Sequence, residues 1–233
     1  RGLGDVYKRQ MQGRLIVFEG TDGSGKATQT ALLCQELDRR GIAYRRLEFP
    51  RYKEESSALI RLYLSGAFGS RPDDVNAYAA ATFYSVDRFA SYRQDWGAYY
   101  EAGGLVIADR YTTSNAVHQT PKLPPEERRG YLEWLFDFEY RLLGLPKPDR
   151  VLYLDLPTEI SERMMRRREQ QTHTRADIHE RDEAYLAACR ESAELTIALC
   201  GWEKIDCSRG GEMRAAEDIH REVMERVEDL LVP

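Results

Sequence analysis

Residues 15–30 read LIVFEGTDGSGKATQT, and this stretch decides the fold. Four consecutive apolar residues open it, which is typical of a strand buried on both faces of a parallel sheet. A glycine-rich turn follows at residues 20–26, and apolar residues then recur at helical spacing as far as Leu37. The stretch is therefore predicted to form a strand, a turn and a helix, in that order.

This order is the context in which a phosphate-binding loop is found. Backbone N–H groups at the start of a helix can point at phosphate oxygens, and glycines let the backbone approach them closely. A lysine at the helix start adds a mobile charge for the outer phosphates. The alternative, a glycine-rich turn with an incidental lysine, is disfavoured by the spacing. The residues predicted to bind a nucleoside triphosphate are Gly20, Gly23, Ser24, Gly25, Lys26, Ala27 and Thr28.

Ala27 departs from the motif, which has Ser or Thr after the lysine to bind magnesium. Alanine has no oxygen to offer. Either the metal is held more through water and another carboxylate, or Thr28 takes the role. Nucleotide binding itself does not depend on this choice.

The composition is that of one large domain. The chain has 233 residues, of which 42% are hydrophobic and 31% charged. The net charge of −5 disfavours a nucleic-acid surface, and no apolar run has the length of a membrane span. Residues 1–10 precede Met11 and are expected to be a non-native or disordered leader, so residues 11–233 are taken as the single domain. The four cysteines show no metal spacing, which favours reduced thiols and a cytoplasmic location.

Strands and helices alternate along the chain. Strands are predicted at residues 15–18, 42–49, 105–108, 151–156 and 203–207. Helices are predicted at residues 27–40, 57–64, 73–92 (with Asp73 as N-cap), 125–143, 178–200 and 213–232. This alternation predicts an α/β fold with a five-stranded parallel sheet and helices on both faces.

In open α/β sheets the ligand lies at the carboxyl ends of the strands. Asp109 comes directly after an apolar strand and is predicted to bind magnesium; an N-cap or an ion pair with Arg110 is the alternative. Arg88 and Arg110 could each bind a phosphate through two hydrogen bonds. Tyr84 and Arg88 share one helix face, which suits a base with a phosphate attached, although such pairs are also common on ordinary helix surfaces.

An arginine-rich segment follows the fourth predicted strand. Such a run is usually a solvated helix face. Its position before the polar stretch QQTHTRAD favours instead a mobile lid at residues 163–178, which would close over the transferred phosphoryl group. The arginines concerned are Arg163, Arg166, Arg167, Arg168 and Arg175.

Four segments together resemble the thymidylate kinase family: FEGTDGSGKATQ at residues 18–29, YSVDR at 84–88, DRY at 109–111 and SNA at 114–116. The likeness extends from Gly13 to the last helix. Members transfer the γ-phosphoryl group of ATP to dTMP, giving dTDP, on a three-layer phosphate-loop fold with a lid. The resemblance therefore implies ATP and dTMP as substrates, Mg²⁺ as cofactor and a homodimer.

The resemblance also assigns the residues that bind dTMP. Asp22 looks like the carboxylate that contacts the sugar hydroxyl, and Tyr84 stands where a Phe usually stacks on thymine. Arg88 and Arg110 match the arginines that recognise the base and the acceptor phosphate. The complete set implied for dTMP is Asp22, Arg51, Tyr84, Arg88, Arg110, Ser114 and Asn115.

The catalytic residues follow from the same resemblance. Gly23 and Ser24 replace the loop arginine of one subgroup, so the lid is expected to supply the catalytic arginine. His118 stands where Tyr is common, so the resemblance does not say which residue contacts the base on that side of its pocket. The catalytic set implied is Lys26, Asp22, Arg110 and Arg166, with Asp109 on the metal. Competing hypotheses are another nucleoside monophosphate or deoxynucleoside kinase, and a degenerate ATP-binding regulator.

Overall fold

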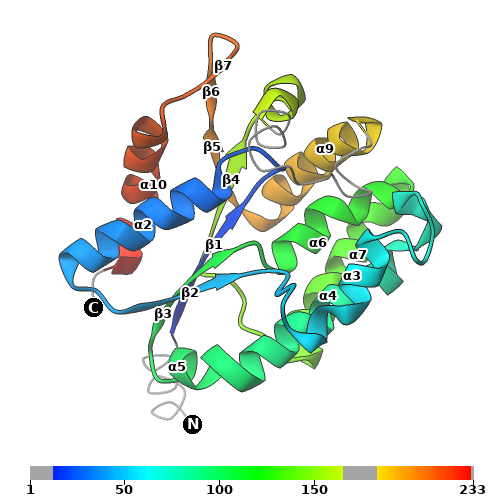
Figure 1. The fold of residues 1–233 in the computed structure, drawn as a ribbon, viewed down its shortest axis with the longest axis horizontal. Helices are drawn as coiled ribbons and strands as arrows, with labels where there is room; N and C mark the ends of the chain where they lie inside the picture. The colour runs from blue at the N-terminus through cyan, green and yellow to red at the C-terminus, as the bar shows by residue number, and fades with distance from the viewer. Residues whose placement is uncertain (1–12, 165–182, 232–233) are drawn as a thin grey trace.

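A five-stranded parallel sheet lies at the centre of the molecule (Figure 1). The structure, a computed structural model, describes residues 13–164 and 183–231. The strands lie in the order β2-β3-β1-β4-β5, and every neighbouring pair is parallel, as the alternation predicts. Their bounds are Arg14–Glu19 (β1), Tyr44–Glu48 (β2), Leu105–Asp109 (β3), Arg150–Asp155 (β4) and Glu203–Asp206 (β5).

Helices cover both faces of this sheet, which makes the three predicted layers (Figure 1). On β1, Ile16 and Phe18 pack in one core with α2 (Lys26–Arg40) and α10 (Ala216–Leu231). Leu15 and Val17 point the other way and pack in a second core with aromatic residues before β3. Because β1 is buried on both sides, its apolar run is continuous rather than alternating.

The other helices surround the second face and the carboxyl ends of the strands. They are α3 (Ala58–Leu64), α4 (Ala77–Ser91), α5 (Gly97–Glu101), α6 (Thr112–His118), α7 (Pro125–Phe136), α9 (Glu183–Cys200) and a helical segment at residues 158–164. Short 3-10 turns occupy Glu55–Ser57, Pro72–Asp74 and Thr120–Lys122, and π-helical turns occupy Tyr92–Trp96 and Asp137–Leu142. The helix predicted at residues 125–143 thus ends as a π turn.

Two helix starts differ from the prediction. Asn76, not Asp73, is the N-cap of α4, because its side chain accepts a hydrogen bond from the Ala79 N–H at 2.9 Å. Asp73 lies in the preceding 3-10 turn instead. The last helix begins at Ala216, since the residues before it form an antiparallel hairpin of β6 (Ser208–Arg209) and β7 (Glu212–Met213).

Some predictions concern parts of the chain outside the described residues. These are the leader at residues 1–10, the start of the helix at residues 178–200, and the lid beyond Arg163 and Met164, with Arg166, Arg167, Arg168 and Arg175. Among the residues that are described, no helix combines the length and the apolar character needed to span a membrane.

Candidate active site

The site lies where three neighbouring strands end. Phe18 of β1 and Glu48 of β2 both pair with Asp109 of β3, so the loops that follow these strands begin side by side. Together with residues of α3 and α4, they enclose a pocket of about 280 Å³. Of the predicted dTMP-binding residues, the pocket brings together Asp22, Tyr84, Arg88, Arg110, Ser114 and Asn115, but not Arg51.

The phosphate-binding loop connects β1 to α2. Gly20 and Gly25 have φ angles of 150° and 93°, which favour glycine. A Cβ atom at Gly20 would lie 2.6 Å from the Leu154 carbonyl oxygen, so no larger residue fits there without a shift. Ala27 and Thr28 are exposed on the first turn of α2.

Lys26 is buried and turned back onto the loop. Its Nζ donates hydrogen bonds to the carbonyl oxygens of Gly20 and Thr21, both at 2.9 Å, and lies 3.8 Å from Asp22 Oδ1. Burial lowers the pKa of Lys26, and the charge of Arg110 lowers it further, against the opposing effect of nearby carboxylates. Bound phosphate oxygens would favour the charged form of this lysine, because they bring negative charge to a desolvated cation.

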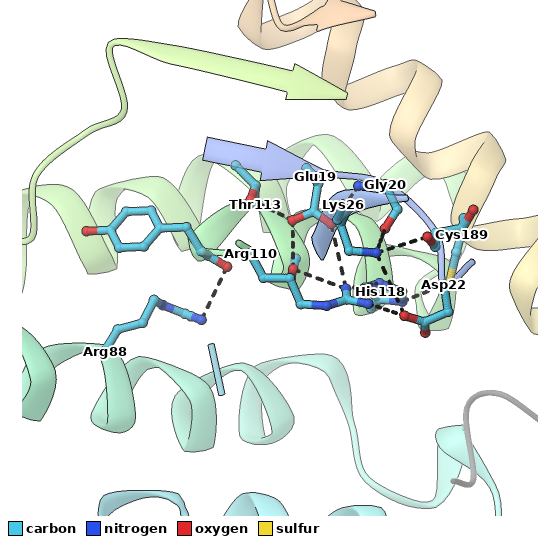
Figure 2. A network of polar contacts seen from close by, with 12 residues as sticks. Glu19, Gly20, Asp22, Lys26, Arg88, Arg110, Thr113, His118 and Cys189 are labelled. Atoms are coloured by element: carbon cyan, nitrogen blue, oxygen red, sulfur yellow. Dashed lines mark hydrogen bonds and ion pairs between the residues drawn. The ribbon is translucent and has the colours of Figure 1, made fainter. Parts of the chain in front are cut away.

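Arg110 links the loop to the pocket (Figure 2). Its Nη2 forms an ion pair with Asp22, and its Nη1 lies 3.7 Å from Glu19 Oε1 and 3.2 Å from His118 Nε2. Burial alone lowers the pKa of Arg110, but the charges of Asp22 and Glu19 outweigh it and raise that pKa. Among the described residues Arg110 is the one non-glycine with a positive φ, 67°. Such backbone strain is often found at functional sites.

Glu19 is a functional candidate that the sequence analysis missed. It is fully buried at the end of β1, and its Oε2 accepts hydrogen bonds from the hydroxyl groups of Thr113 and Ser114, both at 2.7 Å. Its Oε1 accepts from the Gly20 N–H at 3.0 Å. An acidic residue directly after an apolar strand and before the glycine turn was the signal in the sequence.

Arg88 is held from behind by a second buried acid, Glu139. The Arg88 Nε donates to Glu139 Oε2 at 2.8 Å, and its Nη2 pairs with Oε1. Its Nη1 donates to the Tyr111 carbonyl oxygen at 3.3 Å. Burial alone lowers the pKa of Arg88, but Glu139 outweighs it and raises that pKa. The residues alone left two interpretations of Arg88 open, a ligand-binding arginine or an ordinary helix surface; the structure buries it to 1% exposure at the pocket wall.

The remaining predicted dTMP residues have partners of their own. Ser114 donates to Glu19, and Asn115 Nδ2 donates to the Ala81 carbonyl oxygen at 3.2 Å. Arg51 lies beside the pocket, where its Nε is 3.5 Å from Asp87 Oδ1. Gln119, which the sequence analysis gave no role, also lines the pocket, and its buried Oε1 has no hydrogen-bond partner among the described residues.

Asp109 ends β3 close to the loop and is 6% exposed. Burial raises the pKa of Asp109, while the charges of Lys26 and Arg110 lower it. No group of three or more His, Cys, Asp or Glu side chains with metal-binding geometry occurs in residues 13–164 and 183–231. Asp109 therefore offers a single carboxylate at the edge of the phosphate-binding loop.

The fold and the site together define a class of protein. A glycine-rich loop after the central strand of a parallel sheet, with a buried lysine at the helix start, is the architecture of phosphate-loop nucleotide-binding proteins. An arginine-lined pocket beside the loop adds room for a second, anionic ligand, as phosphoryl transfer to an acceptor requires.

Comparison with known proteins gives the family. The thymidylate kinase family model matches residues 18–210, and the chain therefore belongs to the thymidylate kinase family. It is 34% identical over 196 residues to the thymidylate kinase of Mycobacterium tuberculosis, covering 81% of this chain and 87% of that protein. It is 30% identical over 193 residues to the thymidylate kinase of Caenorhabditis elegans, covering 79% and 81%.

The fold comparison agrees. The solved structure of thymidylate kinase from Candida albicans superimposes with a TM-score of 0.68 and 22% sequence identity, and the match covers 94% of this chain and 92% of that one. The predicted phosphate-loop kinase fold is thereby confirmed, as is the resemblance from which it was inferred.

Proposed function

We propose that this protein transfers the γ-phosphoryl group of ATP to dTMP, giving ADP and dTDP. One observation carries the proposal: the Asp22–Arg110 ion pair joins the phosphate-binding loop to the arginine-lined pocket. Asp22 lies 3.8 Å from Lys26 on the donor side, and Arg110 faces the pocket on the acceptor side. Two phosphate groups bound on either side of this pair would be neighbours.

The donor triphosphate is assigned to the loop. The backbone from Gly20 to Thr28 wraps its phosphates, and Lys26 exchanges its contacts with the Gly20 and Thr21 carbonyl oxygens for phosphate oxygens. Ala27 contributes its backbone N–H alone. Ser24 lies in the same loop; it is fully buried, and its hydroxyl has no hydrogen-bond partner within residues 13–164 and 183–231.

The acceptor dTMP is assigned to the pocket. Arg110 binds its phosphate, with Arg51 nearby, and Asp22 accepts a hydrogen bond from the sugar hydroxyl. Tyr84 stacks on thymine, while the base edge faces Arg88 and Asn115, with Ser114 behind them. All of these except Arg51 line the pocket, which supports the assignment.

Transfer is proposed to be direct and in line, without a covalent enzyme intermediate. Lys26 and Arg110 neutralise charge that spreads over the transferred group, and Arg166 of the lid is the third positive charge proposed. Asp109 suits Mg²⁺, because a hard cation commonly binds one or two carboxylates together with phosphate oxygens and water. When bound, Mg²⁺ would supply charge neutralisation on the phosphates. Asp109 would bind it, and the side chain of Ala27 would contribute no ligand atom.

A homodimer in the cytoplasm is part of the proposal. Exposed apolar side chains at i, i+3 spacing on two neighbouring helices support the dimer: Leu59 and Leu62 on α3, Val86 and Phe89 on α4, all 40–54% exposed. Size-exclusion chromatography with light scattering tests it. A dimer mass that falls to the monomer mass in Leu62→Glu supports this surface, and a monomeric wild type refutes it.

An acceptor panel tests the function. Purified protein with ATP and Mg²⁺ is offered dTMP, dUMP, UMP, CMP and thymidine, and ADP release is followed. The proposal predicts the highest kcat/KM with dTMP. A higher value for another monophosphate, or for thymidine, would assign the protein to a different nucleotide or deoxynucleoside kinase activity. ATP binding without transfer to any acceptor would favour the degenerate regulator that Ala27 suggests.

A further inference from the structure

Glu139 gathers hydrogen-bond donors from two helices at the back of the pocket. It lies in the π turn after α7 and is fully buried. Its Oε1 accepts from the Ser85 hydroxyl at 2.7 Å and from Asn115 Nδ2 at 3.5 Å, and its Oε2 accepts from the Thr112 hydroxyl. Arg88 donates to both oxygens. A buried carboxylate with this many donors is held in one orientation.

The pairing decides how Arg88 is presented. Its Nε and Nη2 edge is used by Glu139, so the guanidinium plane is fixed as a bidentate pair. The Nη1 corner is left for the Tyr111 carbonyl oxygen at 3.3 Å and for the pocket that Arg88 lines. Asn115, which also lines the pocket, is tied to the same carboxylate. Without the acid, Arg88 would lose both contacts on its Nε–Nη2 edge and keep the one to Tyr111. Asn115 would keep its 3.2 Å hydrogen bond to the Ala81 carbonyl oxygen.

We infer that Glu139 is a positioning residue for the acceptor nucleotide: it never touches the nucleotide but aims Arg88 and Asn115 at it. The inference rests on the proposed function, because it requires that these two side chains bind the acceptor. This role differs from that of an ion pair that only stabilises the fold. Loss of such a pair would change stability alone, whereas loss of a positioning residue changes acceptor binding and leaves donor binding unchanged.

Glu139→Gln tests this with nearly the same shape and no charge. We expect the KM for dTMP to rise by about 10- to 100-fold, since one charge-assisted contact of Arg88 is misdirected, with the KM for ATP within about twofold. In an Arg88→Ala background the same substitution should raise the KM for dTMP much less, because the residue acts mainly through Arg88. Glu133→Gln is the matched control: Glu133 is an exposed acid on α7, paired with Arg129 at 3.1 Å, and should change neither KM.

Thr112→Val is the second variant, in case Glu139→Gln does not fold. It removes one donor to Glu139 without leaving a buried charge unpaired, and a severalfold rise in the KM for dTMP is expected. Thermal melts establish that each variant is folded. A folded Glu139→Gln or, failing that, a folded Thr112→Val with wild-type KM for dTMP overturns the inference. Wild-type protein that neither transfers to dTMP nor binds it in calorimetry overturns the proposed function, and the inference with it.

Discussion

Replacing Arg110 by alanine removes the side chain that joins the two halves of the proposed site. Arg110 is 19% exposed and forms ion pairs with Asp22 and with the fully buried Glu19. After Arg110→Ala, Glu19 keeps its three hydrogen bonds from the Gly20 N–H and the hydroxyls of Thr113 and Ser114 but loses its cation. We therefore expect a folded protein that is destabilised by about 1–3 kcal/mol.

The effect on activity should be larger and confined to the acceptor. A hydrogen bond to a charged group contributes about 1.5–3 kcal/mol, so a bidentate contact with the dTMP phosphate contributes about 3–6 kcal/mol. At 1.4 kcal/mol for each factor of ten, kcat/KM for dTMP should fall by about 10²- to 10⁴-fold. ATP affinity should change little, because the charge of Arg110 lowers the pKa of Lys26 and its loss leaves that lysine more firmly protonated.

The assay is steady-state ADP release with dTMP varied, together with titration of a fluorescent ATP analogue and a thermal melt. Arg129→Ala is the control, since Arg129 is 73% exposed and, among the described residues, forms an ion pair with Glu133 alone. Near-normal kcat/KM for dTMP in folded Arg110→Ala would refute the acceptor assignment. A parallel loss of ATP binding would refute the division between donor and acceptor sides.

The phosphate-binding loop and one half-buried lysine, Lys122, give three further predictions. Gly20→Ala should destabilise the protein by about 1–3 kcal/mol and abolish ATP binding, because its Cβ would meet the Leu154 carbonyl oxygen at 2.6 Å; a melt and an ATP titration check this, and unchanged affinity contradicts it. Lys26→Met should lower kcat by at least about 10²-fold with the fold intact, whereas wild-type turnover in the ADP assay would remove Lys26 from the mechanism. Burial lowers the pKa of Lys122 from 10.5 to about 8, so the unfolded chain binds more protons between these values and stability rises with pH there. Relative to Lys122→Met, the unfolding free energy of the wild type should rise by about 1–2 kcal/mol from pH 8 to 9.5 in urea titrations, and a flat or falling difference would contradict the burial of this amine.

The elements that the sequence predicted well are those with local signals. The apolar run of β1, the glycine turn and Lys26 lie next to one another in the sequence. The strands β3 and β4 were likewise predicted from uninterrupted apolar runs. The start of α10 was missed although a local signal existed. Gly210 and Gly211, with φ angles of 60° and 80°, form the two-residue turn of a hairpin that ends at Met213.

The parts of the site that could not be predicted from the sequence depend on contacts between distant segments. Arg88 is buried because Glu139, 51 residues away, neutralises it, and periodicity on α4 cannot reveal that partner. Glu19 is likewise held by hydroxyl groups 94 and 95 residues further along, at Thr113 and Ser114. Glu139 follows Leu135 by four residues, and Leu135 lies on the buried face of α7. This helical spacing was a sequence signal that Glu139 is a buried acid.

In the proposed mechanism, two phosphate groups meet between Lys26 and Arg110. A crystal structure of the protein with dTMP and a non-hydrolysable ATP analogue would show whether they do. We expect a γ-phosphate oxygen within hydrogen-bonding distance of Lys26 Nζ and the dTMP phosphate within hydrogen-bonding distance of the Arg110 guanidinium. A dTMP phosphate bound away from Arg110, or a base outside the pocket that Arg88 lines, would contradict it.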